Sequence, residues 1–333
     1  MTSEFELIDR LSKRFATPEG VAVGIGDDAA VLDPGRFDLV TTDSLVEGIH
    51  FRRDICGAAD VGWKSLAASL SDIAAMGGGP GAFFLSLAMP SPLEVEWVDG
   101  FCDGLAEAAR ELVPESFDVS LGGGDLTGSP GPIVITITLL GEASPAGPVL
   151  RKNAVPGDRV VVIGEPGLSA AGLTVLNDES TDPADYPELV RAYRRPNALV
   201  HAGGLLGLYG VPSSMIDISD GLLQDLSHLL QASRVGAQVE ASQLPIAAEL
   251  TALEEAGLGR VEDWLLGGGE DYCLLMTIPP ARMPKIWDMA RRREWEVFDI
   301  GEVRSPEEGL TVLGLDGEEL TREIGGYRHF EDS

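Results

Sequence analysis

The sequence predicts a mixed α+β protein of two domains, on three observations. The chain has 333 residues, and globular domains hold about 150 residues each. Strand-like and helix-like patterns are interleaved along both halves, without the regular alternation that is typical of a doubly wound parallel sheet. The turn-rich segment GEASPAGP at residues 141–148 separates the halves. We therefore expect an N-terminal domain over residues 1–148, in which helices accompany a mixed sheet, and a C-terminal α+β domain over residues 149–333.

Hydrophobic patterning places the elements within each half. Apolar residues that alternate or run continuously are typical of strands, and those that recur every third or fourth position are typical of helices. The expected strands are residues 39–42, 83–89, 133–140, 159–163 and 272–278. The expected helices are residues 60–76, 94–112 and 221–232. We interpret 83–89 and 133–140 as edge strands, which need pairing partners.

Charge and composition exclude several classes of function. The chain carries 54 Asp and Glu against 24 Lys and Arg, a formal net charge of −30, so its field repels nucleic acids and anionic membranes. The longest apolar stretch, residues 133–140, is far shorter than the roughly 20 residues that span a bilayer. The N-terminal MTSEFELIDRL lacks the basic start and apolar core of a signal peptide, and the 3 cysteines are too scattered for a disulfide framework. We therefore expect a cytoplasmic protein that binds neither nucleic acid nor membrane.

Carboxylates beside glycines or other small residues, placed where apolar strands end, are the most informative feature. They occur in GIGDD (24–28), TTDS (41–44), GGGD (122–125), DISDG (217–221) and GGGED (267–271). A single Asp beside Gly is ordinary turn chemistry. The adjacent acids Asp27-Asp28 and Glu270-Asp271 are harder to explain in this way, because each pair lies in an apolar run where an uncompensated charge is costly to bury. With only 4 lysines and no cluster of His or Cys, we expect the compensating cation to be a hard divalent metal, Mg²⁺, Mn²⁺ or Ca²⁺.

A polar face on the helix expected at residues 60–76 agrees with a ligand site. Ser65, Ser69 and Asp72 share one side of this helix, which lets a ligand or another backbone approach closely. No GxxxxGK[ST] phosphate loop is present. GIGDDA matches the dinucleotide-binding pattern GxGxxG/A, but no helix can follow it before Pro34, and two carboxylates would repel a bare pyrophosphate. We therefore favour phosphate that is bridged by metal ions.

The motifs, taken together, resemble one known family. GIGDDAAVL, TTDSLVEGIHF, WKSLAASLSDIAAMG, GGGDLT, IDISDGLLQDLSHL and GGGEDY, in this order, are similar to the motifs of the thiamine-monophosphate kinases, from about Phe5 to the terminal GGYRHF. The resemblance implies a superfamily that also holds aminoimidazole ribonucleotide synthetase, selenophosphate synthetase and a hydrogenase-maturation protein. It implies an N-terminal domain that dimerises through its sheet into a barrel, giving a homodimer. It further implies ATP as co-substrate, several Mg²⁺ ions, and thiamine monophosphate as the acceptor.

The resemblance also assigns roles to individual residues. The implied metal ligands are Asp28, Asp43, Asp72, Asp125 and Asp217, with Thr42 and Asp220 assisting. The implied ATP-binding residues are Gly124, Asp125, Ser219 and Arg151, the last of which would grip the phosphates. The implied thiamine-phosphate contacts are His50, Glu270, Ile324 and Tyr327. Some relatives carry Trp where Ile324 stands, which leaves Tyr327 as the nearest aromatic side chain to stack on the thiamine rings. On its residues alone, the EGIHF segment favours a packed core histidine at His50 over a substrate contact.

The residues agree with the phosphoryl transfer that the resemblance implies, and they offer no evident catalytic side chain. Transfer between two phosphates is catalysed chiefly by charge neutralisation and positioning, which bound Mg²⁺ supplies. A phosphate monoester has a second pKa near about 6 and is largely dianionic at neutral pH, so it needs no general base. The sequence has no evident Ser-His-Asp or Cys-His arrangement, and we expect direct in-line transfer.

Two alternatives to this function stay open. One is another enzyme of the superfamily, such as an ATP-dependent cycloligase or a selenophosphate synthetase. A selenophosphate synthetase would need a reactive Cys near its N-terminus, and the first 24 residues hold none. The other alternative is a noncatalytic acidic protein that binds metal without transferring anything from ATP.

Overall fold

The chain forms two compact units in this computed structural model, which describes residues 20–23, 31–32, 35, 37–92, 95–321 and 324–326. Unit 1 comprises Met1–Pro145 and Ala198–Gly204, and unit 2 comprises Ala146–Asn197 and Leu205–Ser333. The expected mixed α+β architecture is confirmed, with a mixed sheet at the centre of each unit. The domain boundary expected at residue 148 stays a prediction, and the division into units falls at Pro145.

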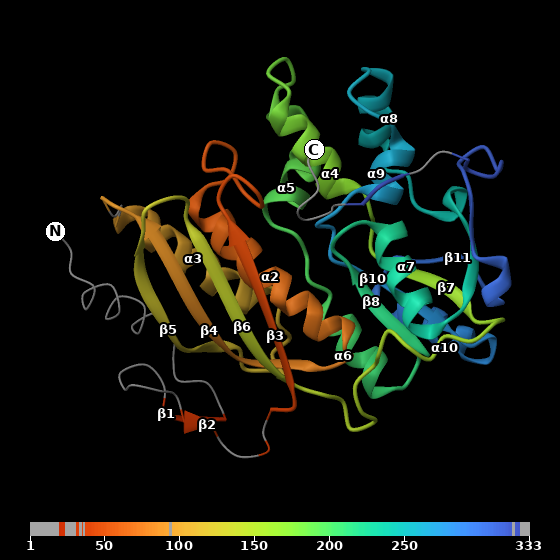
Figure 1. The fold of residues 1–333 in the computed structure, drawn as a ribbon, viewed down its shortest axis with the longest axis horizontal. Coiled ribbons are helices and arrows are strands. Elements are labelled where there is room, and N and C mark those ends of the chain that lie inside the picture. Colours follow the sequence, from red (N-terminus) through yellow and green to blue (C-terminus); the bar gives the residue numbers. More distant parts are fainter. Residues whose placement is uncertain are drawn as a thin grey trace. The chain divides into compact units, whose positions relative to one another are not determined.

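Unit 1 is built on a four-stranded sheet with helices on one face. Its strands lie in the order β3 (Leu39–Val46), β6 (Val134–Glu142), β4 (Gly79–Pro90) and β5 (Ser120–Ser129). Only β4 and β5 are parallel, and the other pairs are antiparallel. Helices α2 (Ala58–Ala75) and α3 (Val95–Glu111) pack on each other, and α2 lies on the sheet (Figure 1). A separate antiparallel pair is formed by β1 (Val21–Val23) and β2 (Val31–Leu32).

The strands of this sheet correct two expectations. Residues 83–89 and 133–140 belong to β4 and β6, which lie in the centre of the sheet, so their interpretation as edge strands is wrong. The edges are β3 and β5. Strand β5 is not expected from its sequence, because SLGGGDLTGS has neither apolar alternation nor an apolar run. Its backbone pairing with β4 makes it a strand.

The two faces of this sheet differ in polarity. Directly paired residues on neighbouring strands point to the same face. One row across the four strands is Asp43, Ile137, Leu85 and Gly124, and the next row is Ser44, Thr136, Ser86 and Asp125. Ile137 and Leu85 are only 1% and 2% exposed, so the first row faces the helix layer. The second row faces the opposite side, where Ser44 and Ser86 are exposed.

Helices α2 and α3 approach so closely that only glycine fits at two positions. A Cβ at Gly104 would lie 1.9 Å from Ala59 O, and a Cβ at Gly62 would lie 2.1 Å from Phe101 O. In both cases the obstacle is backbone, which cannot rotate aside as a side chain would. This contact holds α2, the helix that carries Ser69 and Asp72.

Unit 2 is built on a six-stranded sheet. Its strands lie in the order β12 (Leu310–Leu313), β9 (Gly236–Glu240), β11 (Val297–Arg304), β7 (Arg159–Ile163), β10 (Cys273–Ile278) and β8 (Ser214–Ile218). All neighbouring pairs are antiparallel except β12 and β9. Strands β7 and β10 confirm the strands expected at residues 159–163 and 272–278.

Helices and short 3-10 turns complete unit 2. The helices are α4 (Leu168–Asn177), α5 (Pro187–Arg194), α6 (Val200–Leu208, which begins in unit 1), α7 (Leu222–Ser233), α8 (Ala248–Glu255), α9 (Val261–Gly267) and α10 (Met283–Arg293). The 3-10 turns are η1 (Pro183–Asp185), η2 (Ala241–Gln243), η3 (Pro280–Arg282) and η4 (Pro306–Glu308). None of the described helices combines the length and the apolar character needed to cross a membrane.

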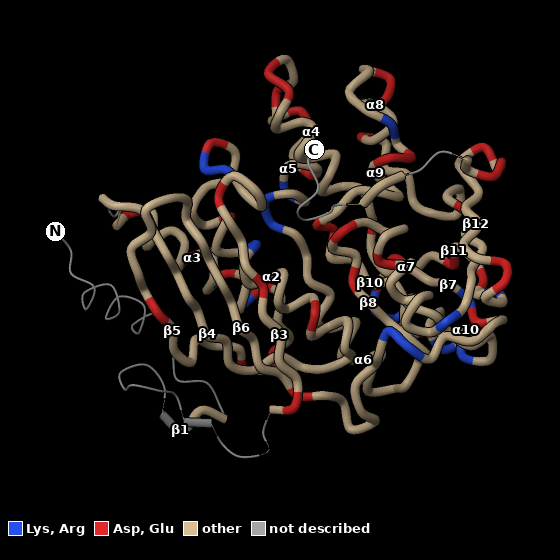
Figure 2. The backbone as a smooth tube through the Cα atoms, viewed as in Figure 1, with Lys and Arg blue, Asp and Glu red and all other residues tan. Residues whose placement is uncertain are grey.

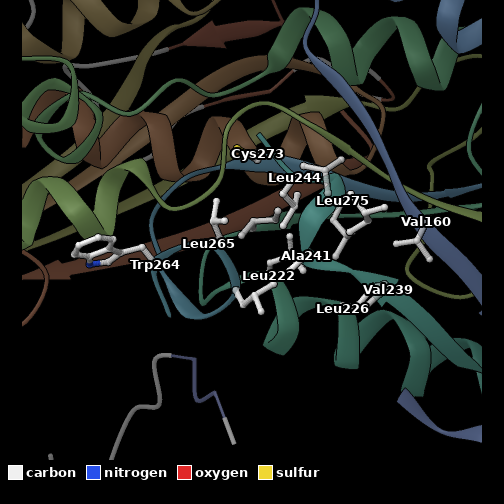
Figure 3. Close-up of a cluster of buried hydrophobic side chains, with 14 of the residues drawn as sticks. Val160, Leu222, Leu226, Val239, Ala241, Leu244, Trp264, Leu265, Cys273 and Leu275 are labelled. Atoms are coloured by element: carbon white, nitrogen blue, oxygen red, sulfur yellow. The ribbon is translucent and has the colours of Figure 1, made fainter. Parts of the chain in front are cut away.

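An apolar cluster joins several helices of unit 2 to one face of its sheet. Leu222 and Leu226 of α7 pack with Leu265 of α9 and with Val160 and Leu275 of the sheet (Figure 3). The apolar stripe expected on residues 221–232 is therefore confirmed as the buried face of α7. This packing places the N-terminal end of α7 beside the last residue of β8.

Candidate functional site

A pair of carboxylates forms the candidate site in unit 1. Asp43 lies on β3, and Asp72 lies on α2, which packs against that strand. Ser69, one turn before Asp72, donates from Oγ to Asp43 Oδ2 at 2.9 Å. Thr41, on the same face of β3 as Asp43, donates from Oγ1 to Asp72 Oδ2. Each carboxylate is therefore held by a hydroxyl group from the other element.

The electrostatics of this pair favour a bound cation. Burial and then the neighbouring charge of Asp72 raise the pKa of Asp43 from 3.8 to about 6, although the hydrogen bond from Ser69 lowers it. Two close carboxylates beside neutral hydroxyls make a donor set of oxygen atoms with excess negative charge. Such a set fits a hard divalent cation, which would supply the positive charge that the hydroxyls lack.

Thr42 does not face this pair with its side chain. Successive residues of a strand point to opposite faces of the sheet, and Thr42 Oγ1 lies 3.1 Å from Thr138 Oγ1 on the other face. Thr41 is the threonine whose hydroxyl group faces the carboxylates. Within unit 1, only the backbone of Thr42 stays close to Asp43.

Within one chain, Asp125 lies far from the pair of carboxylates formed by Asp43 and Asp72. It lies on β5, at the opposite edge of the sheet from β3, and its row faces away from the helices. Three strand spacings separate these edges, about 14 Å in all, whereas two oxygens on one Mg²⁺ lie within about 4 Å of each other. Gly124, next to it, packs tightly on β4, because a Cβ there would lie 2.1 Å from Leu85 O. One copy of unit 1 therefore cannot offer Asp43 and Asp125 to a common ion.

His50 lies in a tight turn after β3. Its backbone N–H donates to Val46 O at 2.9 Å, and its Nδ1 accepts from Val46 N at 3.1 Å. Gly48 N donates to Phe51 O at 2.8 Å and closes the turn. A neutral ring whose Nδ1 accepts carries its proton on Nε2. The backbone turn thus sets both the position and the tautomer of this half-buried ring.

The loop between β8 and α7, residues 219–221, forms the candidate site in unit 2. Asp225 Oδ2, from the first turn of α7, accepts the backbone N–H groups of Ser219 at 3.0 Å, Asp220 at 3.0 Å and Gly221 at 3.2 Å. Burial raises the pKa of Asp225 to about 7, with the three N–H groups lowering it and the charge of Asp220 raising it. Gly221 has φ +119°, and a Cβ there would lie 2.7 Å from Gly267 O, so this turn requires glycine.

The GGGED segment lies directly against this loop. Glu270 N donates to Ser219 O, and Tyr272 N donates to Ile218 O, both at 2.8 Å. Glu270 and Tyr272 have φ values of 63° and 51°, which cost energy in residues other than glycine and occur often at functional sites. The strained backbone of Glu270 is therefore held in place by the neighbouring loop.

A buried carboxylate anchors the other side of this segment. Asp271 Oδ2 accepts from Gly167 N at 2.6 Å, and its Oδ1 accepts from Ser169 N at 3.0 Å, at the start of α4. Burial raises the pKa of Asp271 to about 7, although these two N–H groups lower it. Burial, and then the charges of Asp271, Glu165 and Asp217, raise the pKa of Cys273 well above its usual range. Asp217, which lies on β8 and is 3% exposed, is therefore close enough to Cys273 to act on its thiol.

The C-terminal described residues close over both loops. A Cβ at Gly267 would lie 2.9 Å from Ile324 Cγ2, and a Cβ at Gly326 would lie 2.5 Å from Asp220 O. Ile324 also packs against the apolar cluster of unit 2. Unit 2 thus gathers Ser219, Asp220, Glu270 and Ile324, and a further residue of the expected site, Asp217, lies two residues before this loop on β8.

Arg151 lies at the other end of α7. Its carbonyl oxygen accepts from Oγ of Ser233, the last residue of that helix, at 3.0 Å. Helix α7 has 12 residues and spans about 17 Å. The exposed Arg151 is therefore not brought to Ser219 within unit 2. Two further residues of the expected site, Asp28 and Tyr327, lie outside the described part of the chain.

The chain is similar to known proteins over nearly its full length. Residues 26–143 match the family AIR synthase related protein, N-terminal domain, and residues 155–312 match AIR synthase related protein, C-terminal domain. The chain is 33% identical to the thiamine-monophosphate kinase of Bacillus subtilis (strain 168), over 98% of this chain and 99% of that relative. The chain belongs to the thiamine-monophosphate kinase family.

Solved structures of thiamine-monophosphate kinases have the same fold. The protein from Stenotrophomonas maltophilia K279a is 34% identical, with a TM-score of 0.82 over 96% of this chain and 98% of that chain. AaThiL complexed with AMPPCP and TMP is 31% identical, with a TM-score of 0.73 over 98% of this chain and 97% of that chain. The family resemblance carried by the motifs is thus confirmed.

Three contributors to these sites are missing from the sequence-based assignment. The sequence TTDS does not show whether Thr41 or Thr42 faces the carboxylates, because this depends on which residues of β3 point toward the helices. Asp225 does have a local signal, since an acidic residue in the first turn of a helix is typical of capping by backbone N–H groups. The role of Asp271 lies in its hydrogen bonds to the start of α4, which is about a hundred residues away along the chain, so no local sequence signal indicates it.

Proposed function

We propose that the protein transfers the terminal phosphoryl group of ATP to thiamine monophosphate, giving thiamine diphosphate and ADP. The observation that carries this proposal is the near full-length similarity to thiamine-monophosphate kinases, one of which is described in complex with AMPPCP and TMP. The paired carboxylates of unit 1 and the acidic loops of unit 2 support it, because they suit phosphates that are held by cations.

Mg²⁺ is the cation that we assign to these residues. Asp43 and Asp72 would hold it in unit 1, and Asp217 and Asp220 would hold it in unit 2. The remaining proposed ligands are Asp28, Thr42 and Asp125. Bound Mg²⁺ would supply charge neutralisation between the donor and acceptor phosphates. Burial and then the charge of Asp72 raise the pKa of Asp43, and a bound divalent cation would offset both costs of the ionised carboxylate. Acidic positions are spread over both units (Figure 2).

The protein's own residues bind and orient the two substrates in this proposal. The nucleotide contacts are Gly124, Asp125, Ser219 and Arg151, and the thiamine-phosphate contacts are His50, Glu270, Ile324 and Tyr327. The acceptor phosphate is already largely dianionic at neutral pH, so no side chain has to remove a proton from it. We therefore assign no catalytic base and propose direct in-line transfer. The cytoplasmic location stays a prediction.

A homodimer completes the proposed site. Asp43 and Asp125 lie at opposite edges of one sheet, so one copy of unit 1 does not offer both to a common ion. A partner copy would bring a second β5 edge to β3. The open face and the edges β3 and β5 offer that contact, and Val40 on β3 is 70% exposed. We propose that two such sheets close into a barrel.

Light scattering tests the dimer. We expect a dimeric mass at active concentrations, and we expect Val40→Asp to shift the protein toward a monomer with at least about tenfold lower activity, since a buried unpaired charge costs about 1.4 kcal/mol or more. Val155→Asp, at a 54% exposed position of unit 2, is the matched control and should stay dimeric. A monomeric wild-type protein that is fully active would contradict the dimer.

Mg²⁺ binding is expected to weaken as the pH falls below about 6. Protons compete with metal for the same oxygens, and the pKa of Asp43 in the metal-free protein is about 6. Between pH 7 and pH 5 the affinity should fall about tenfold, because only about one tenth of this carboxyl group is ionised at pH 5. Calorimetric titration with Mg²⁺ at pH 7, 6 and 5 measures this change. An affinity that is constant over this range would show that Asp43 is not a ligand.

An assay with parallel acceptors tests the reaction itself. Purified protein is incubated with ATP, Mg²⁺ and thiamine monophosphate, and the products are separated by chromatography, with thiamine, formylglycinamidine ribonucleotide and selenide in parallel incubations. We expect only thiamine monophosphate to gain a phosphoryl group, with one ADP for each thiamine diphosphate. Aminoimidazole ribonucleotide or selenophosphate as product would assign the chain to a sister activity. ATP binding without turnover would favour a noncatalytic role.

A further inference from the structure

Asp225 makes a contact that goes beyond ordinary helix capping. It is 2% exposed, and a single oxygen, Oδ2, accepts three consecutive backbone N–H groups within 3.2 Å. A carboxyl oxygen accepts such hydrogen bonds in both protonation states, and roughly twice as strongly when the group is ionised. Three of them on one atom fix the orientation of three successive peptide groups in residues 219–221.

The orientation of these peptide groups decides how the loop presents its side chains. With the N–H groups turned toward Asp225, the carbonyl of Ser219 points to Glu270 N and accepts from it. The side chains of Ser219 and Asp220 remain half-buried rather than enclosed. Gln224, from the same helical turn as Asp225, donates to Asp220 Oδ2 at 3.2 Å. Both the backbone and the carboxylate of the loop are therefore positioned from the start of α7.

We propose that Asp225 is a positioning residue that holds loop 219–221 in the conformation in which Ser219 and Asp220 receive the metal-bound nucleotide. It acts through the three backbone N–H groups and not by touching a substrate. This inference rests on the proposed function for the identity of the nucleotide, while the control of the loop conformation stands without it.

Direct binding of metal by Asp225 is the competing role. Ligand atoms of Asp220, Asp225 and His228 lie within 4.8 Å of one another. Oδ2 of Asp225 is already surrounded by three donors, however, and a cation at this oxygen would face the positive ends of the same N–H groups. Only Oδ1 is left for a cation. The three hydrogen bonds therefore favour positioning over coordination.

Substitution of Asp225 should weaken the binding of thiamine monophosphate less than the binding of ATP. Glu270 N is bonded to Ser219 O of the loop, but its neighbours have anchors outside residues 219–221. Asp271 is bonded to the start of α4, and Tyr272 N is bonded to Ile218 O. A change at Asp225 should therefore alter KM for ATP more than KM for thiamine monophosphate. A loss of overall stability would affect both equally.

Three variants test the proposal: Asp225→Ala, Asp225→Asn and the control Asp158→Ala. Asp158 is also 2% exposed in unit 2, and its Oδ2 also accepts a backbone N–H, from Val155 at 3.3 Å, away from the proposed site. The first measurement is amide hydrogen exchange of the peptide that covers residues 219–221. The second is the pair of KM values, for ATP at saturating Mg²⁺ and for thiamine monophosphate.

In Asp225→Ala we expect exchange at residues 219–221 to accelerate at least about tenfold and KM for ATP to rise about tenfold to a hundredfold, with KM for thiamine monophosphate within about twofold. Asp225→Asn keeps an acceptor oxygen without the charge, so both effects should be smaller. Asp158→Ala should change neither. If Asp225→Ala does not fold, the same two measurements on Asp225→Asn decide.

Three results would overturn the proposal. Unchanged exchange at residues 219–221 would show that Asp225 does not hold the loop. If both KM values change by the same factor in Asp225→Ala, and the same change occurs in Asp158→Ala, the effect is a general one on stability. Normal loop exchange combined with a loss of Mg²⁺ affinity in Asp225→Asn would show that Asp225 is a metal ligand. If the wild-type protein does not phosphorylate thiamine monophosphate, the proposed function fails, and the exchange measurement still tests the loop.

Discussion

Asp72→Asn is expected to lower phosphoryl transfer at least about a thousandfold while it stabilises the metal-free fold. The activity falls because the metal loses a charged ligand, and electrostatic stabilisation usually contributes most to this kind of catalysis. Thr41 can still donate to the Asn side-chain oxygen, so the position of the side chain is kept. Asp125→Asn should lower the activity in the same way, because we propose Asp125 as a metal ligand at the edge of the sheet that meets the partner copy.

The stability effect of Asp72→Asn has a defined pH dependence. Asp43 has an unfolded pKa of 3.8 and a folded pKa of about 6, raised by burial and by Asp72. The cost in folding free energy therefore grows as the pH rises from about 4 to about 6 and is complete above about pH 6. Removing the charge of Asp72 relieves part of this cost. We expect the metal-free variant to be more stable by about 1 to 2 kcal/mol at pH 8, after allowance for solvent screening, and unchanged at pH 4.

Thermal unfolding at both pH values and steady-state kinetics measure these two effects. Asp60→Asn is the matched control, because Asp60 lies in the first turn of the same helix, three turns before Asp72, and accepts the cap N–H of Gly57 at 3.2 Å. It should retain activity within a few fold. Turnover of Asp72→Asn within tenfold of the wild type at saturating Mg²⁺ would remove Asp72 from the metal site.

Gly104→Ala is expected to destabilise unit 1 by about 3 kcal/mol or more, as overpacking does when backbone must move. The new Cβ would lie 1.9 Å from Ala59 O and 2.7 Å from Ala59 Cα. Helices α2 and α3 would have to separate, and the separation would displace Ser69 and Asp72 from Asp43. Activity should therefore fall together with stability. On an exposed helix, by contrast, Gly→Ala stabilises by about 1 kcal/mol.

The control for this variant lies one turn earlier on α3. A Cβ at Gly100 would lie 3.1 Å from the Ala58 Cβ and 3.9 Å from Ala59 N, so small shifts accommodate it. Gly100→Ala should change the free energy of unfolding by less than about 1 kcal/mol. Urea denaturation followed by tryptophan fluorescence measures both variants, and Trp63, buried in α2, is one of the 5 tryptophans that contribute. Equal stability of the two variants would show that α2 and α3 do not depend on close contact at Gly104.

The elements with strong local periodicity were predictable from the sequence. Helix α7 has leucines on one face, and β7 has an apolar run after a Pro-Gly-Asp turn, so hydrophobic spacing alone locates both. The glycine-rich β5 has no such pattern and forms only because β4 offers a parallel partner. The central positions of β4 and β6 were not predictable either, because a strand's neighbours are segments distant in the sequence.

The sequence by itself determined the chemistry of this protein: carboxylates beside glycines, few lysines, no nucleophile with a base, and motifs that resemble one family in order. Those properties depend on residue types and on their spacing along the chain. Only the tertiary structure decided that Thr41 rather than Thr42 faces Asp72, that Asp43 and Asp125 lie at opposite edges of one sheet, and that Asp225 holds loop 219–221. Each of these depends on strand register and helix packing, and those are set by contacts between segments far apart in the chain, which local patterns do not encode.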